Sequence, residues 1–129
     1  MFKKNKLFFL VCCLILLLAA VFRFYRLGSL TSPYWEEVAL AYDSYSLLET
    51  GRDHHGNPWP LVAVESFGDF KASFYFYAAL PFIRLFGLNV LAIRLPSAIA
   101  GLYLVWGTAC LAQALAKKWQ KNQRQQIMK

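Results

Sequence analysis

Residues 95–116 read LPSAIAGLYLVWGTACLAQALA and contain no charged side chain. A helix needs about 20 consecutive apolar residues to cross the hydrocarbon core of a bilayer. Pro96 lies near the start of the run, where the first turn of a helix tolerates it. Lys117 and Lys118 end the run and Trp119 follows, an order typical of a membrane–water interface. This stretch predicts a transmembrane helix, and therefore a membrane protein.

A second apolar run lies near the N-terminus. Residues 7–22 are all apolar, and Phe24 and Tyr25 extend the run beyond Arg23. Basic residues ahead of a short apolar core are also typical of a cleaved signal peptide, but no good A-x-A cleavage site follows this one. We therefore favour an uncleaved membrane anchor over residues 7–25, with Arg23 reaching toward the interface.

The composition agrees with a membrane protein. Charged residues make up 16% of the 129 residues, whereas soluble domains contain about 25%. The net charge is +7, but the basic residues flank the apolar runs and form no basic face of a folded domain. Nucleic-acid binding is therefore disfavoured, and the positive-inside rule accounts better for the basic ends.

The acidic residues are confined to one part of the chain. All seven lie between residues 36 and 69, where Arg52 is the only base, so this stretch has a net charge of −6. Since both ends of the chain are basic, the positive-inside rule predicts that both termini are cytoplasmic and that the acidic stretch lies outside.

These patterns predict an all-α, multi-pass integral membrane protein with two transmembrane helices joined by an extracytoplasmic loop with interfacial helices. The predicted segments are a basic cytoplasmic N-terminus at 1–6, a transmembrane helix at 7–25, an extracytoplasmic loop with juxtamembrane helices at 26–88, a second transmembrane helix at 89–116 and a basic cytoplasmic tail at 117–129.

Two helices are expected within the loop. In SPYWEEVALAYDSYSLLETG (32–51), Ser32 suits an N-cap, Pro33 suits the first helical position, and Gly51 suits the residue after the helix. FYFYAALPFIRLFGL (74–88) is apolar and aromatic but too short to span a bilayer, so we expect a helix lying in or near the interface.

Glu36 and Glu37 are the first candidates for a functional role. In the first turn of a helix, two carboxylates can simply compensate the helix dipole. Alternatively, a carboxylate held just above a bilayer can act as a general base on an acceptor hydroxyl. The spacing of the two residues does not separate these interpretations.

Other candidates carry weaker signals. Lys71 can be a lysine that reaches toward the interface or one that contacts a phosphate. Asp53, His54 and His55 resemble a metal cluster, but neighbouring histidines point apart in most backbone conformations and no third ligand has a recognisable spacing. We therefore predict no required cofactor, with a divalent metal as a minor alternative. The three cysteines show no CxxC or metal spacing.

The order of these features resembles the N-terminal part of the GT-C membrane glycosyltransferases. The closest similarity is to the bacterial branch related to dolichyl-phosphate-mannose protein mannosyltransferases and to the aminoarabinose transferase of lipid A (glycosyltransferase family 39-like). It covers about residues 23–101. The segments that carry it are RLGSL (26–30), YWEEVALAYDSYSLLETGRDHHGNPWPL (34–61), SFGDFKASFYFYAALPFIRLFGLN (66–89) and AIRLPSAIAG (92–101).

The resemblance assigns roles to individual residues. Glu36 matches the catalytic aspartate of the family, and Glu37 matches its glutamate partner. Lys71 matches a lysine that precedes a proline pair, implying a contact to the donor phosphate. Arg94 and Pro96 match the opening of the second span.

The chain also departs from the family pattern. Glu36 stands where the family has aspartate, and Ala72 and Ser73 replace the proline pair. Family members carry many more spans, so the chain is expected to be an N-terminal fragment of such an enzyme.

The resemblance implies transfer of a sugar from a polyprenyl-phosphate donor to a hydroxyl of a protein, lipid or glycan outside the cytoplasm. It also implies a location in a bacterial plasma membrane, with membrane lipid around the spans. The alternative is a non-catalytic small membrane protein or assembly subunit that retains this scaffold.

Overall fold

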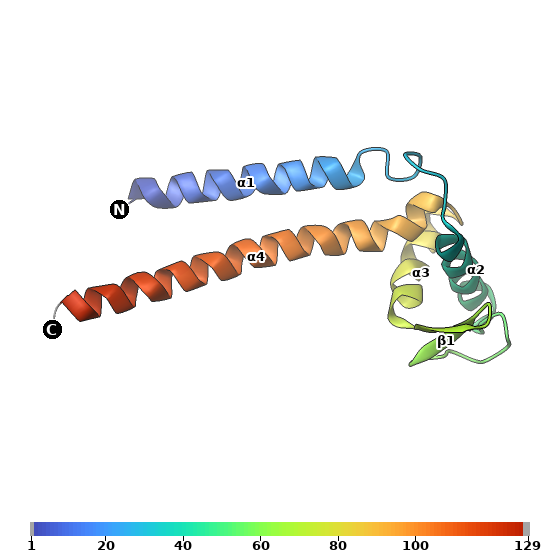
Figure 1. The fold of residues 1–129 in the computed structure, drawn as a ribbon. Helices are drawn as coiled ribbons and strands as arrows, with labels where there is room; N and C mark the ends of the chain where they lie inside the picture. The colour runs from blue at the N-terminus through green and yellow to red at the C-terminus, as the bar shows by residue number, and fades with distance from the viewer. Residues whose placement is uncertain (1, 128–129) are drawn as a thin grey trace. The chain divides into compact units, whose positions relative to one another are not determined.

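The computed structural model describes residues 2–127, apart from the side chains of residues 2–5, 124 and 127. The outermost residues of the predicted basic ends, 1 and 128–129, lie outside the described part. Within residues 2–127 the chain forms four helices and one two-stranded sheet (Figure 1). These elements are α1 (Phe2–Phe24), α2 (Trp35–Thr50), β1 (Ala63–Ser66), β2 (Asp69–Ala72), α3 (Phe74–Phe86) and α4 (Val90–Ile127).

The chain divides into two compact units. Residues 24–99, called here the loop unit, contain α2, the sheet, α3 and the start of α4. The other unit contains residues 1–23 and the part of α4 from residue 100 onward. The sequence predicts an all-α fold. Its helical character is confirmed, because most described residues lie in the four helices, but two short strands also form.

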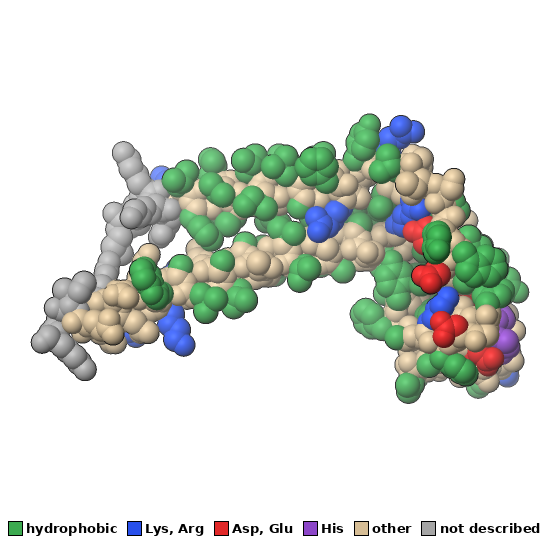
Figure 2. All heavy atoms as spheres, viewed as in Figure 1, with side chains coloured by type: hydrophobic (Ala, Val, Ile, Leu, Met, Phe, Trp, Pro, Cys, Tyr) green, Lys and Arg blue, Asp and Glu red, His purple; other side chains and the backbone are tan. Residues whose placement is uncertain are grey.

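Two of the helices, α1 and α4, are long and apolar enough to cross a membrane. The rest of the described chain buries 0% of the apolar stretch of α1 and 6% of that of α4, so the described residues leave both stretches almost entirely uncovered. Figure 2 shows hydrophobic side chains along both helices. Because the polar tail is rich in good helix formers and has neither glycine nor proline, α4 continues beyond the predicted end at residue 116 to Ile127.

The start of α2 differs from the sequence prediction. The N-cap is Tyr34 and the helix begins at Trp35, so the assignment of Ser32 and Pro33 to these positions is wrong. The backbone N–H of Tyr34 donates to Oε2 of Glu37 at 3.1 Å, which satisfies a donor that the helix itself leaves unpaired. Glu37 at the N3 position therefore fixes where the helix begins.

The predicted end of α2 at Gly51 is confirmed. Gly51 adopts a left-handed conformation with φ of 67°, and its N–H donates to the carbonyl oxygen of Leu47 at 3.0 Å. A Cβ atom at this position would lie 2.8 Å from Nε1 of Trp59. Both the backbone conformation and the indole ring therefore require glycine here.

A β-hairpin, which the predicted all-α fold does not include, lies between the two predicted loop helices. Strands β1 and β2 pair antiparallel, from Ala63 opposite Ala72 to Ser66 opposite Asp69. Phe67 and Gly68 form the two-residue turn with φ of 51° and 83°, the positive pair that a type I′ hairpin turn needs. The sequence offered only the glycine of the usual Asn-Gly signal, so the hairpin was missed.

The core of the loop unit forms between α2, α3 and the hairpin. One cluster contains Leu47, Val64 and Phe76, which are all at most 1% exposed. A second cluster joins α3 to the start of α4 and contains Ala79, Ile83, Ala92 and Ile93. These contacts hold α2 against α3 and place the first turn of α2 near the first turns of α4.

Candidate functional site

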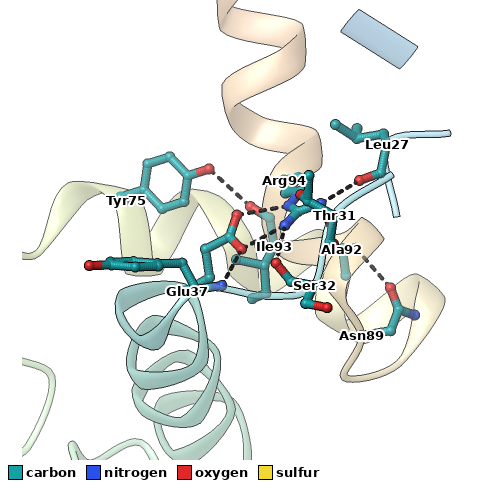
Figure 3. Close-up of polar contacts among 10 residues, drawn as sticks. Leu27, Thr31, Ser32, Glu37, Tyr75, Asn89, Ala92, Ile93 and Arg94 are labelled. Atoms are coloured by element: carbon teal, nitrogen blue, oxygen red, sulfur yellow. Dashed lines mark hydrogen bonds and ion pairs between the residues drawn. The ribbon is translucent and has the colours of Figure 1, made fainter. Parts of the chain in front are cut away.

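The two adjacent glutamates at the start of α2 have different environments. Glu37 forms a bidentate ion pair with Arg94 of α4 (Figure 3). Nε of Arg94 donates to Oε1 at 2.7 Å and Nη2 donates to Oε2 at 2.8 Å. The side chains of Arg94 and Glu37 are 14% and 32% exposed. Paired geometry and partial burial make this a strong ion pair rather than a weak surface contact.

Arg94 also organises the segment that leads into α2. Its Nη1 donates to the carbonyl oxygen of Leu27 at 3.0 Å, and longer contacts reach the carbonyls of Thr31 and Ser32. One guanidinium therefore fixes the entering segment, the first turn of α2 and the start of α4 relative to one another. The sequence analysis noted Arg94 only as a family match and missed this pair, because 57 residues separate the two partners.

The start of α4 is itself held in place. The side-chain oxygen of Asn89 accepts from the N–H of Ala92 at 2.9 Å, as an N-cap does. The hydroxyl of Tyr75 in α3 donates to the carbonyl oxygen of Ile93 at 2.9 Å. Figure 3 shows these contacts on either side of Arg94. The guanidinium therefore projects from a capped turn that α3 also supports.

Glu36 is exposed, in contrast to its neighbour. Within residues 2–127 no hydrogen bond or ion pair involves its carboxylate. Glu36 lies on the same face of α2 as Asp43, seven residues further on, which is fully buried. Its carboxylate therefore lies at the exposed end of a helix face that is buried further along α2.

Lys71, the candidate for a phosphate contact, lies in a strand. It is a half-buried residue of β2 and pairs across the hairpin with Val64. Within the described residues no hydrogen bond or ion pair joins Lys71 to Glu36 or Glu37. The two glutamates are neighbours in the sequence, and the structure does not connect the lysine to them.

The loop after α2 uses Asp53 as its own internal scaffold. Oδ1 of Asp53 accepts from the backbone N–H groups of His55 and Asn57, and Oδ2 accepts from the side-chain amide of Asn57. Burial alone would raise the pKa of Asp53, but these hydrogen bonds outweigh it and leave the pKa below its ordinary value. Both carboxylate oxygens are therefore engaged in the turn.

The two histidines of this loop do not point apart, so that expectation is wrong. Their ring centroids lie 4.0 Å apart. Nδ1 of His54 donates to Oδ1 of Asp43, while Nε2 of His55 lies 3.8 Å from Oε1 of Glu65. Among the described residues no three potential ligand side chains converge on a metal position. The sequence signal that could have drawn attention to Asp43 was an acidic residue in the middle of a predicted helix.

A pocket of about 270 Å³ lies beside the ion pair. Its walls are mostly apolar side chains from residues 33–42, which include the first half of α2, and from residues 88–93 at the start of α4. They include Pro33, Val38, Tyr42, Leu88 and Ile93, and Glu37 contributes at one side. Because the carboxylate of Glu37 is already paired with Arg94, this pocket suits an apolar group rather than a charged one.

Acid is expected to destabilise the loop unit through Glu37 and Asp53. The hydrogen bond from Arg94 is the main cause that lowers the pKa of Glu37, and burial opposes it. The ordinary pKa is 4.5 for Glu37 and 3.8 for Asp53, and folding lowers both. In acid the unfolded chain therefore binds more protons than the folded chain. The stabilisation is therefore complete above about pH 5 and is lost as the pH falls further.

Thermal unfolding followed by circular dichroism between about pH 6 and about pH 3 tests this expectation. Glu37→Gln and Asp53→Asn should each reduce the fall in Tm, because each removes one carboxylate that must be protonated. A fall as steep in the double variant as in the unchanged protein would contradict it.

Comparisons of the chain with protein-family models, curated proteins and solved structures found no match.

Proposed function

We propose that this chain crosses a membrane twice and supplies the extracytoplasmic loop of a glycosyltransferase. The enzyme would move a sugar from a polyprenyl-phosphate donor to an acceptor hydroxyl. Support for membrane insertion comes from α1 and α4, whose apolar windows are long enough to span and are almost unburied by the described chain. Basic residues at both ends of the chain favour cytoplasmic termini, and a bacterial plasma membrane is the proposed location.

The observation that carries the proposal is the different state of the two glutamates. Glu37 is held by Arg94 and fixes the start of α2. Glu36 is exposed and has no hydrogen bond or ion pair with the described residues. A general base must be free to accept a proton, and a positioning residue must be rigid. Glu36 meets the first requirement, and its neighbour Glu37 meets the second.

In the proposed reaction, Glu36 takes the proton of the acceptor hydroxyl as its oxygen attacks the anomeric carbon. The bond between that carbon and the phosphate oxygen breaks, and its electron pair leaves with the polyprenyl phosphate. Lys71 is proposed to offset the charge of this phosphate, by resemblance to the family rather than by a contact to Glu36. Glu37 acts as a positioning residue through Arg94.

The proposal is tested with membranes from cells that express the complete gene product. The donors are polyprenyl-phosphate mannose and polyprenyl-phosphate aminoarabinose, each labelled in the sugar. We expect gene-dependent release of polyprenyl phosphate and transfer of label to an acceptor. If neither donor is consumed above the level of membranes without the gene, the alternative of a non-catalytic membrane protein is favoured.

A further inference from the structure

Three aromatic side chains gather on the outer surface of the loop unit beside His54. The ring of Phe67 lies 5.5 Å from that of Trp35, 6.0 Å from that of Tyr42 and 4.9 Å from that of His54, measured between centroids. Trp35, Tyr42 and Phe67 remain 63%, 53% and 49% exposed. We call Trp35, Tyr42, Phe67 and His54 the aromatic shelf. Phe67 contacts the other three rings, and Trp35, Tyr42 and Phe67 keep about half of their surface open, whereas the side chain of His54 is 14% exposed.

The central residue of the shelf has an unusual backbone. Phe67 occupies the first turn position of the hairpin with φ of 51°, where asparagine, aspartate or glycine is preferred. A bulky residue with a positive φ is rare, and such residues concentrate at functional sites. The hairpin therefore carries an aromatic ring at a position where the backbone alone would favour another residue.

The imidazole of the shelf is fixed before any ligand arrives. Nδ1 of His54 donates to Asp43, which is fully buried in α2. In the neutral ring this leaves Nε2 as a hydrogen-bond acceptor. The ring also stacks on Phe67 and lies beside His55, whose own Nε2 approaches Glu65. Oriented polar groups thus border the apolar rings.

The charge around the shelf indicates what it can bind. Aromatic residues near a membrane often form an interfacial belt. The stretch 36–69, however, has seven acids and one base, a net charge of −6, and in Figure 2 red side chains lie over the loop unit with blue ones among them. Anionic lipid surfaces attract basic segments and repel acidic ones. The shelf is therefore matched to a neutral or cationic ligand.

We propose that the aromatic shelf is a saccharide-binding surface. The apolar C–H faces of sugar rings stack on Trp35, Tyr42 and Phe67, and sugar hydroxyls donate to Nε2 of His54. Trp35 and Tyr42 are seven residues apart on α2, or about 10 Å, so the shelf accommodates a short oligosaccharide. The negative surroundings select neutral sugars and amino sugars over anionic ones. The further statement that this saccharide is the acceptor for Glu36 rests on the proposed function. The binding of a saccharide to the shelf does not depend on it.

The test is isothermal titration calorimetry on the whole chain in nanodiscs of phosphatidylcholine. The probes are chitotetraose, which is neutral, and its fully deacetylated form, which is cationic. Phe67→Asn removes the ring and places Asn-Gly, the preferred type I′ sequence, in the turn, so the hairpin is preserved. His54→Asn keeps an N–H for Asp43 but removes Nε2. Phe74→Ala is the control, because Phe74 is 81% exposed and makes no ring contact with the shelf.

We expect at least one tetrasaccharide to bind, and Phe67→Asn and His54→Asn each to weaken binding about 10-fold. Phe74→Ala should leave the affinity unchanged. The proposal is overturned if neither tetrasaccharide binds, if Phe67→Asn binds as tightly as Phe74→Ala, or if the shelf instead binds vesicles that contain phosphatidylglycerol. Saccharide binding by the unchanged protein that is accompanied by no sugar transfer from either donor would support the shelf while counting against the proposed enzyme.

Discussion

Glu36→Gln is expected to lower sugar transfer by about 10²- to 10⁴-fold, the usual contribution of a general base. Glutamine has nearly the same shape but cannot take the proton of the acceptor. Because Glu36 is exposed and unpaired within the described residues, the replacement removes no stabilising contact. The measurement is the initial rate of donor consumption in membranes that contain equal amounts of protein, with Tm as a check on folding.

Two variants serve as controls for this result. Glu36→Asp retains a base in the form that the resembled family carries, so it should retain measurable transfer. Glu37→Gln removes the neighbouring charge, and we expect it to lower Tm through the loss of Arg94 binding. A Glu36→Gln protein that transfers sugar at the unchanged rate would rule out the catalytic role, whatever the result for Glu37→Gln.

Arg94→Met is expected to destabilise the loop unit by about 3 kcal/mol. Methionine keeps most of the apolar stem but leaves Glu37 without its partner, in a place where both side chains are mostly buried. It also leaves the carbonyl oxygen of Leu27 without its donor. Unfolding in urea, followed by circular dichroism in detergent, measures the change.

A double-mutant cycle separates the ion pair from the other contacts of Arg94. The double variant with Arg94→Met and Glu37→Gln should lose less unfolding free energy than the two single variants lose in sum. The difference, which is the coupling energy, should be about 1–3 kcal/mol. Arg94→Lys should recover only part of the stability, because an ammonium group cannot form the bidentate contact. A coupling energy near zero would show that the pair seen in Figure 3 contributes nothing to stability.

The long helices and the end of α2 could be predicted from the sequence because their causes are local. A continuous apolar run predicts a membrane-length helix wherever it occurs, as it does for α1 and α4. Gly51 ends α2 because only glycine readily adopts the left-handed conformation there. The start of α2 was misplaced since Tyr34 caps the helix through the side chain of Glu37, a contact that the N-cap preferences do not anticipate.

The hairpin and the pairings of polar side chains depended on tertiary structure. Strand pairing is set by partners on another segment, and a turn sequence of Phe-Gly gave little local signal. Glu36 and Glu37 are adjacent in the sequence, and for each of them the sequence was compatible with either dipole compensation or catalysis. Arg94, 57 residues away, binds one carboxylate and leaves the other exposed. Asp43 likewise became a buried partner of His54 only through the loop that folds back on α2. Hydrogen bonds between distant residues depend on where the packed core brings them, so only the tertiary structure distinguished the two glutamates.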